Sequence, residues 1–266
     1  MKVSQNWLKE LVDINSTPEV LAEKLSIGGF EVESLKDTSL QVKGVLLGNV
    51  LSVEKHPNST KLSVCQVDIG NKNILQIVCG AKNIKSDIHV YVATVGSYLS
   101  SIDLSIKKSE IRGVSSEGMI CSLEELGLDS NTDGIEIIDP LTIKDHKLGT
   151  EASKILGLND HIFDLAITAN RPDGMSVIGI AREISALLQT KLTLPPEHEI
   201  INLNAFKENK LCQETINKEC IYTISFIDNV NGKQTSPKWI KERLEKSDIK
   251  SKNLIVDITN YILLEQ

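Results

Sequence analysis

Cysteine is sparse in this sequence, and its spacing matches no common bridge or metal motif. The 266 residues include five cysteines, an odd number without a CxxC pair, which argues against a disulfide framework and against a structural zinc site. The five histidines show no ligand spacing such as HExxH, so we expect no metal site. Free thiols are typical of a reducing compartment. We predict buried, reduced thiols at Cys65, Cys79, Cys121, Cys212 and Cys220.

Long apolar runs are also missing. No segment approaches the roughly 20 apolar residues that a membrane-spanning helix needs. The opening residues, Met1–Trp7, lack the apolar stretch and the small-residue cleavage site of a signal peptide. We therefore predict a soluble, cytoplasmic protein without a membrane partner.

Positive charge is not in excess over the whole chain. Lys and Arg number 29 against 36 Asp and Glu, which gives a net charge of −7. Such an average does not favour a nucleic-acid partner. The charge is uneven, however, because residues 43–126 carry nine basic and eight acidic side chains, and the remainder carries the whole deficit. Net charge alone therefore decides nothing about nucleic-acid binding.

The first 36 residues predict two helices and a strand. One short helix has an apolar face formed by Trp7, Leu8, Leu11 and Val12. The second helix has two candidate N-caps, either Ser16 in a capping box or Thr17 followed by Pro18 at the first helical position. It is expected to end at Gly28-Gly29. Alternation over residues 30–35 then predicts a strand.

A different texture follows, with short β-branched runs between turns that contain Gly, Pro and Asn. These runs predict five strands, at Val45–Val53, Leu62–Val67, Ile74–Val78, Ile88–Val95 and Leu104–Ile111. Five strands in about 85 residues indicate a small closed barrel, of which the oligonucleotide-binding (OB) fold is an example.

The rest of the chain predicts a mixture of helices and strands. Apolar spacing predicts a helix over residues 177–188, broken by Leu194-Pro195-Pro196. We expect a strand over Ile221–Val230, a helix capped by Ser236-Pro237, and a buried strand at Leu254–Val256. The final residues are still apolar, so we expect the front part of a longer polypeptide. The predicted fold class is α+β, with several domains.

Three turns of the predicted barrel carry candidate binding residues. Lys, Arg, Asn and Ser side chains suit phosphate and ribose oxygens as hydrogen-bond donors. Together with one histidine, the candidates are His56, Asn58, Lys61, Lys82, Asn83, Arg112 and Ser116. Few rings, Tyr91 and Tyr98, are available for stacking on bases. The alternative is that these are ordinary turns with solvated charges, and spacing alone leaves both interpretations open.

Ordered motifs in the barrel and beside it resemble one family. The barrel resembles the OB-type tRNA-binding domain of several tRNA-handling proteins, through Gly48-Asn49-Val50, His56-Pro57-Asn58, Lys61-Leu62, Val67–Gly70, Ile77–Asn83, Ile111–Val114 and Ser116–Ser122. The flanking segments resemble the bacterial phenylalanyl-tRNA synthetase β-subunit family, in the family's order. They are Met1–Leu11, Thr168–Glu183, Ser236–Ile240 and Val256–Tyr261.

The resemblance implies three domains. Residues 1–40 and 148–195 would form one discontinuous N-terminal α/β domain. An OB-type tRNA-binding domain would occupy residues 41–147, inserted between those two pieces. Residues 200–266 would begin an α/β editing domain that is incomplete in this sequence.

The resemblance also implies an activity. In the family, an α2β2 assembly uses ATP and Mg²⁺ to charge tRNA(Phe) with phenylalanine, and the α subunit carries out this chemistry. The β subunit contacts tRNA and hydrolyses tyrosyl-tRNA, because an apolar pocket cannot strongly reject an isostere that adds a hydroxyl. The implied partners are tRNA(Phe) and the α subunit. No aminoacylation residue and no bound cofactor are implied here, whereas Thr259 and Asn260 would lie in the editing pocket.

The chain departs from the family pattern at two positions. Ser225 stands where a basic residue is usual, and Asp248 stands where a glycine is usual. The sequence also stops before the family's editing histidine. We therefore predict that these residues alone neither charge nor edit tRNA. Two other interpretations stay open, namely a free-standing tRNA-binding module without catalysis and a barrel that serves only as a protein-interaction surface.

Overall fold

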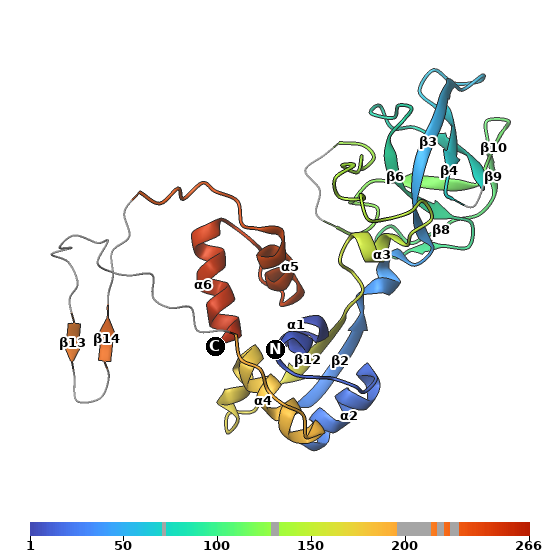
Figure 1. Cartoon of the computed structure of the whole chain (residues 1–266). Helices are drawn as coiled ribbons and strands as arrows, with labels where there is room; N and C mark the ends of the chain where they lie inside the picture. Colours follow the sequence, from blue (N-terminus) through green and yellow to red (C-terminus); the bar gives the residue numbers. More distant parts are fainter. Residues whose placement is uncertain (71–72, 129–132, 196–213, 217–220, 224–228) are drawn as a thin grey trace. The chain divides into compact units, whose positions relative to one another are not determined.

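The computed structural model describes residues 1–70, 73–128, 133–195, 214–216, 221–223 and 229–266 (Figure 1). Contacts between Cα atoms divide the chain into two compact units. One unit comprises Met1–Leu35 with Ile162–Gln266, and the other is Lys36–His161. Within the described ranges, no helix has both the length and the apolar character needed to cross a membrane.

The first unit is built around a three-stranded sheet with the order β1-β12-β2. Its strands are Lys2–Ser4 (β1), His161–Ala166 (β12) and Glu31–Asp37 (β2). β1 runs antiparallel to β12, with Val3 opposite Phe163, and both of these side chains are fully buried. The N-terminal strand therefore pairs with a strand that follows the entire second unit in sequence.

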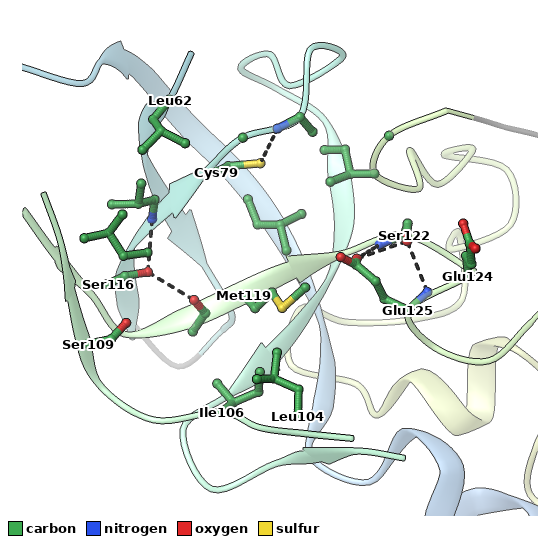
Figure 2. A pocket seen from close by; sticks show the side chains of 18 of the residues that line it. Leu62, Cys79, Leu104, Ile106, Ser109, Ser116, Met119, Ser122, Glu124 and Glu125 are labelled. Carbon is green, nitrogen blue, oxygen red and sulfur yellow. Dashed lines mark hydrogen bonds between the residues drawn. The ribbon is translucent and has the colours of Figure 1, made fainter. Parts of the chain in front are cut away.

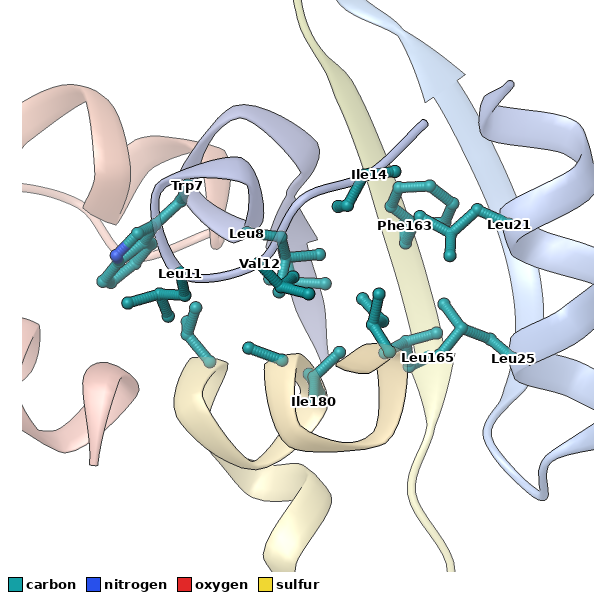
Figure 3. Packing of buried hydrophobic residues seen from close by; sticks show 14 of the residues in the cluster. Trp7, Leu8, Leu11, Val12, Ile14, Leu21, Leu25, Phe163, Leu165 and Ile180 are labelled. Atoms are coloured by element: carbon teal, nitrogen blue, oxygen red, sulfur yellow. The ribbon is translucent and has the colours of Figure 1, made fainter. Parts of the chain in front are cut away.

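Three helices pack their apolar residues into the core of this unit (Figure 3). They are α1 (Gln5–Leu11), α2 (Pro18–Ile27) and α4 (Val177–Leu188). Leu8, Leu21 and Ile180 contribute one side chain from each helix, and all three are fully buried. The predicted helices over these segments and the predicted strand near residues 30–35 are confirmed.

The start of α2 decides between the two candidate N-caps. The Thr17 hydroxyl accepts a hydrogen bond from the Val20 N–H at 3.4 Å, and Pro18 occupies the first helical position. Ser16 is not the cap, and among the described residues its buried hydroxyl has no hydrogen-bond partner. At the other end, Gly28 is the C-cap, as the Gly28-Gly29 pair predicts.

The helix α4 ends earlier than the proline motif that was expected to break it. Its C-cap is Gln189, in the left-handed conformation with φ +54°. The chain then returns to α1, where the Thr193 N–H donates to the Leu11 carbonyl at 2.7 Å. Leu194 and Pro195 follow this contact, so they lie beyond the helix, and Pro196 lies outside the described residues.

The C-terminal part begins with a small hairpin. Ile221–Thr223 (β14) pairs antiparallel with Glu214–Ile216 (β13). Most of the remainder of the predicted strand Ile221–Val230 lies outside the described residues, at 224–228. Two helices follow, at Lys238–Lys246 (α5) and Leu254–Glu265 (α6).

The prediction of a buried strand at Leu254–Val256 was wrong, because this segment begins α6. Asn253 caps the helix, and its Oδ1 atom accepts from the N–H groups of Ile255 and Val256, both at 3.1 Å. The residues turned inward are Asp257, Tyr261, Leu264 and Glu265, which recur at helical spacing. The apolar β-branched run concealed this period in the sequence.

Ser236 does not cap α5, which begins after Pro237 without a side-chain cap. Its hydroxyl instead donates to the carboxylate of Asp257, which also accepts from the Ser251 hydroxyl and, at 2.8 Å, from the Lys252 N–H. Asp257 is fully buried. Burial opposes its ionisation, but these three donors stabilise the charge and hold the pKa of Asp257 below its ordinary value.

A stacked aromatic cluster docks α5 and α6 against α1. The rings of Trp7 and Tyr261 lie 5.2 Å apart between centroids and nearly parallel. The Arg243 guanidinium lies over these rings and over Trp239, at 4.9, 5.7 and 5.1 Å from the respective centroids. It also pairs with Glu10 at 2.5 Å. Cation–π contacts and one charge pair therefore join segments far apart in sequence.

The second unit is a curled antiparallel sheet of five strands with the order β11-β6-β3-β4-β5. The strands are Val45–Lys55 (β3), Ser63–Asp68 (β4), Ile74–Cys79 (β5), His89–Thr94 (β6) and Gly118–Cys121 (β11). Immediately before β11, the Glu117 N–H donates to the carbonyl of Gln76 in β5 at 2.8 Å. This contact brings the two edges of the sheet together.

The predicted fifth strand, Leu104–Ile111, was wrong. Its residues are divided between two hairpins, and the fifth strand of the sheet is β11. The hairpins are β7 (Tyr98–Leu99) with β8 (Leu104–Ser105), and β9 (Ser109–Ile111) with β10 (Val114–Ser116). Lys107 and Lys108 occupy the break and are exposed. Two adjacent exposed lysines are more typical of a bend between two hairpins than of a strand with one buried face.

Two apolar layers cover the faces of this sheet. One contains Val50, Val67 and Val90, and the other contains Leu47 and Leu99 together with the helix α3 (Ala152–Ile155) and the short 3₁₀ segment Thr38–Val42.

The three described thiols, Cys65, Cys79 and Cys121, are buried within the second unit. Their burial, predicted from the sequence, is confirmed. Burial raises the pKa of Cys65 and of Cys121 to about 12. Cys212 and Cys220 lie outside the described residues.

The tight start of α4 predicts that Gly179→Ala destabilises the first unit. A Cβ atom at this position would stand 1.7 Å from the carbonyl oxygen of Asp173, so we expect a loss of about 3 kcal/mol or more. Both tryptophans, Trp7 and Trp239, lie in this unit, so their fluorescence during urea unfolding measures the effect. Gly232→Ala is the control, because its Cβ would meet Ile255 at an ordinary 3.7 Å. Equal midpoints for the two variants would contradict the prediction.

The buried carboxylate predicts a second loss of stability. Asp257→Asn removes the charge that three donors stabilise, so we expect a cost of about 2 kcal/mol at pH 7. Because the folded pKa of Asp257 is lowered, its stabilising effect is present above the unfolded pKa of about 4 and disappears as the pH falls through the folded pKa. The difference between wild type and variant should therefore shrink in acid.

Asp248→Asn is the matched control. Asp248 is exposed and pairs with Lys2 at the surface, so we expect a change of about 0.5 kcal/mol or less. Tryptophan fluorescence during urea unfolding at pH 7 and at pH 3 measures both variants. A pH-independent cost for Asp257→Asn would show that the carboxylate charge contributes nothing.

Candidate nucleic-acid interface

The His56-Pro57-Asn58 turn between β3 and β4 is held against a neighbouring hairpin. His56 is buried, and its Nε2–H donates to the Ile111 carbonyl at 2.9 Å. Its Nδ1 atom accepts from the Asn58 N–H at 3.1 Å. The imidazole is therefore the neutral tautomer with its proton on Nε2. Both ring nitrogens have partners within the chain, so this side chain acts on the turn and not on a ligand.

The same turn fixes the backbone of Arg112. The Asn58 side-chain amide donates to the Arg112 carbonyl at 2.9 Å. Arg112 and Gly113 have φ +49° and +87° and form the two-residue connection between β9 and β10. Two positive φ angles at such a connection are typical of a type I′ turn, which normally takes Asn or Gly at its first position. Arg112 occupies that position with its side chain exposed.

Two further predicted binding residues, Asn83 and Ser116, form hydrogen bonds within the second unit. The amide of Asn83 donates to the Ile135 carbonyl at 2.8 Å, and its oxygen accepts from the Ile135 N–H. Ser116 is buried, and its hydroxyl accepts from the Val78 N–H and donates to the Gly118 carbonyl, both at 3.1 Å. These hydrogen bonds join loops and strands. The polar atoms of both side chains are thereby used within the protein.

The three predicted cations remain available. Lys61, Lys82 and Arg112 are exposed, and within the described residues none forms an ion pair. Their immediate chain neighbours line one cleft of about 970 Å³ (Figure 2). Those neighbours are Leu62, Ala81 and Ile111. The structure thus brings the three predicted turns to the margin of a single cavity.

Other residues of this cleft were not predicted from the sequence. They include Lys107, Glu124 and Asp133, which line the cleft and are exposed. Lys107 was hidden in the supposed strand Leu104–Ile111, although a pair of adjacent lysines in a half-buried strand is itself a sign of a break. Lys108, its neighbour, pairs with Glu117.

The two tyrosines differ in their availability for stacking. Tyr91 is only 3% exposed, and burial raises its pKa, so it cannot receive a base. Tyr98 is 49% exposed, and its hydroxyl donates to Asp103 at 2.6 Å. The hydrogen bond and the charge of Asp103 raise the pKa of Tyr98. Of the two rings considered, only Tyr98 presents a face to solvent.

The two residues predicted for an editing pocket lie next to each other on α6. The Thr259 hydroxyl donates to the carbonyls of Ile255 and Val256, at 3.0 and 2.9 Å, and Asn260 is half-buried. Asp248 has φ +61°, a conformation in which glycine is the more usual residue. Ser225 lies outside the described residues. The roles of Thr259 and Asn260 stay predictions.

Two family models match the chain. A putative tRNA-binding domain matches residues 45–145, and a B3/4 domain matches residues 219–266. The first match contains the whole cleft and its margin. The second contains α5, α6 and the two predicted editing residues.

Full-length relatives match the entire chain. The phenylalanine–tRNA ligase β subunit of Prochlorococcus marinus subsp. pastoris is 67% identical over 266 residues, which is 100% of this chain and 32% of that protein. The β subunit of Prochlorococcus marinus strain MIT 9312 is 66% identical and is covered over 33% of its length. That of Parasynechococcus marenigrum is 49% identical over 271 residues, again 33% of that protein.

The chain therefore spans about a third of the curated relatives that it matches. The curated matches agree in name, and each covers this chain along its whole length. The chain is therefore similar throughout to phenylalanine–tRNA ligase β subunits.

Proposed function

We propose that this chain acts as part of a phenylalanine–tRNA ligase β subunit and that its barrel contacts tRNA. The observation that carries the proposal is that Lys61, Lys82 and Arg112 are exposed and each adjoins in sequence a residue that lines one cleft, within the segment that matches a tRNA-binding domain. Exposed cations without partners attract phosphates and release counterions when they bind. Because His56, Asn58, Asn83 and Ser116 are committed within the barrel, direct RNA contacts belong mainly to the cations.

In this proposal, charging requires the rest of the enzyme. An α subunit, in an α2β2 assembly, joins phenylalanine to tRNA(Phe) with ATP and Mg²⁺, and the present residues alone are inactive. Among the described residues, no group of three or more His, Cys, Asp or Glu is placed to hold a metal ion. We assign ATP and Mg²⁺ to other parts of the assembly.

The C-terminal segment is proposed to contribute to editing. The B3/4 match at residues 219–266 supports this role, and Thr259 and Asn260 are the proposed pocket residues. The Thr259 hydroxyl is occupied by its own helix, which leaves Asn260 as the freer polar group of the pair. We propose domain boundaries with residues 1–40 and 148–195 as one domain, 41–147 as the barrel and 200–266 as part of an editing module.

Replacing the three cations tests the proposed tRNA contact. We expect Lys61→Ala, Lys82→Ala and Arg112→Ala together to weaken tRNA binding about tenfold or more at low salt. The dependence of log K on log salt should become shallower by about two to three, since each lost phosphate contact removes about one. Filter binding at several salt concentrations measures both quantities.

A matched control uses three exposed lysines elsewhere, Lys9, Lys24 and Lys36. Their joint replacement by Ala removes the same charge but leaves the cleft intact, so it should retain the salt dependence of the wild type. Equal losses in both triple variants would reduce the effect to net charge. No loss in either variant would favour the barrel as a protein-interaction surface.

The turn that holds Arg112 generates a further prediction. Asn58→Ala removes the hydrogen bond to the Arg112 carbonyl, so the backbone that carries the guanidinium is no longer held by this turn. We expect a loss of tRNA affinity of about threefold and non-additivity with Arg112→Ala, because directly coupled residues do not act independently. Asn58→Ala with Lys82→Ala, on a different loop, should be additive. Additivity in both pairs would mean that Asn58 does not act through Arg112.

A further inference from the structure

The cleft has an apolar interior, unlike a simple phosphate-binding surface. Leu62, Val78 and Met119 line it half-buried, and Ile106 and Ile135 line it almost fully buried. Figure 2 shows Met119 in the middle of the cavity, with Leu62 on one side and Leu104 and Ile106 on another. A volume of about 970 Å³ is within the range of sites that enclose organic ligands. A ligand that bound only through its phosphates would not contact these apolar side chains.

Cations lie at one end of this interior. Lys61 precedes Leu62, and Arg112 follows Ile111, and both of these apolar neighbours line the cleft. The Asn58 amide joins the two turns by its hydrogen bond to the Arg112 carbonyl, so the two cations belong to one end. Lys107 lines the cleft as well. A phosphodiester chain that passes this end would find several partners of the correct charge.

Acidic residues line the other end. Figure 2 shows Glu124 and Glu125 across the cavity from Leu62, Ser109 and Ser116. The Glu125 carboxylate is already committed, because one oxygen accepts from the Ser122 N–H at 2.7 Å and from its hydroxyl at 3.0 Å. Glu124 is exposed, its backbone carbonyl accepts from the Gly127 N–H at 2.9 Å, and within the described residues its carboxylate has no hydrogen-bond or ion-pair partner. Its carboxylate is an acceptor for which a phosphate would be the wrong ligand.

We propose that the cleft takes an unpaired RNA nucleotide whose base carries an exocyclic amino group, with its phosphates toward Lys61 and Arg112 and its base between Met119 and Glu124. The inference rests on the proposed tRNA contact and adds a base-specific subsite to it. An apolar floor accepts the face of a base, and a carboxylate accepts a hydrogen bond from the amino group of cytosine or adenine. Uracil has a carbonyl oxygen in place of the amino group of cytosine, and a carboxylate repels this oxygen.

Three probes of equal length separate base binding from phosphate binding. They are fluorescently labelled oligo(C), oligo(U) and an abasic oligomer, titrated with the 266-residue chain at one low salt concentration. Fluorescence anisotropy should show oligo(C) binding about fivefold tighter than oligo(U), and the abasic oligomer binding weakest. The factor corresponds to the lower end of the discrimination expected from a base-edge contact.

Two kinds of variant then locate the effect. Glu124→Ala should bring oligo(C) and oligo(U) to equal affinity, whereas Glu54→Ala, which removes an exposed acid outside the cleft, should retain the preference. Ser109→Trp and Ser105→Trp each fill the cleft from an exposed position and should reduce oligo(C) to the level of the abasic oligomer. Ser86→Trp, outside the cleft, is their control. Circular dichroism melts verify that each variant folds, and the two tryptophan blocks serve as independent tests.

Three results are possible, and each leads to a different conclusion. A preference that disappears in Glu124→Ala and in both blocked variants supports the base subsite. Equal binding of all three oligomers, unchanged by the tryptophans, overturns the subsite while leaving the proposed phosphate contact intact. No binding of any oligomer, together with no binding of tRNA, overturns the subsite and the proposed function together.

Discussion

The arrangement of the barrel's exposed cations depends on two hydrogen bonds from one turn. His56 and Asn58 donate to the carbonyls of Ile111 and Arg112, residues that follow more than fifty positions later. Without these bonds, the connection between β9 and β10 would be an exposed two-residue loop, free to move with respect to β3 and β4. With them, the turns that carry Lys61 and Arg112 become one structural element. The cleft beside Leu62 and Ile111 has a defined end for this reason.

This arrangement separates two kinds of polar residue that look alike in the sequence. His56, Asn58, Asn83 and Ser116 satisfy backbone groups and hold strands and loops together. The lysines and the arginine beside them leave their charges in solvent. At the proposed tRNA-binding surface, the hydrogen-bonded polar side chains therefore hold the loops in position, and the exposed cations are free to contact the ligand. A net charge of −7 does not conflict with such a surface, because three or four cations in one place determine the local field.

The sequence was most informative where local chemistry determines structure. The stop at Gly28 and the first four strands of the sheet depend on neighbouring residues and were predicted correctly, and Thr17 was one of the two candidate caps. The strand prediction failed at Leu104–Ile111. The fifth strand of the sheet is instead the short segment Gly118–Cys121, which pairs with β6 although two hairpins separate them in sequence. Nothing local distinguishes those four residues from a loop.

The failure at Leu254–Val256 has another cause. Isoleucine and valine there favour a strand by propensity, yet the Asn253 cap and the buried contacts of Asp257 favour a helix, and tertiary contacts prevail. The candidate site shows the same limit. Lys61, Lys82 and Arg112 were predicted from the residue types in three turns. Their common cleft, with Glu124 at its acidic end, could not be predicted, because the residues that line it are far apart in sequence and are brought together only by folding.

The left-handed backbone of Arg112 implies a compromise between folding and function. A residue with a side chain pays about 1 kcal/mol or more for this conformation, a penalty that glycine avoids and that asparagine reduces. Either of them would make a more comfortable turn beside Gly113. The chain instead keeps a guanidinium at the tip of the hairpin and accepts a less stable barrel. Selection for thermal stability alone would therefore favour glycine or asparagine at this position, and either would remove the positive charge at the mouth of the cleft.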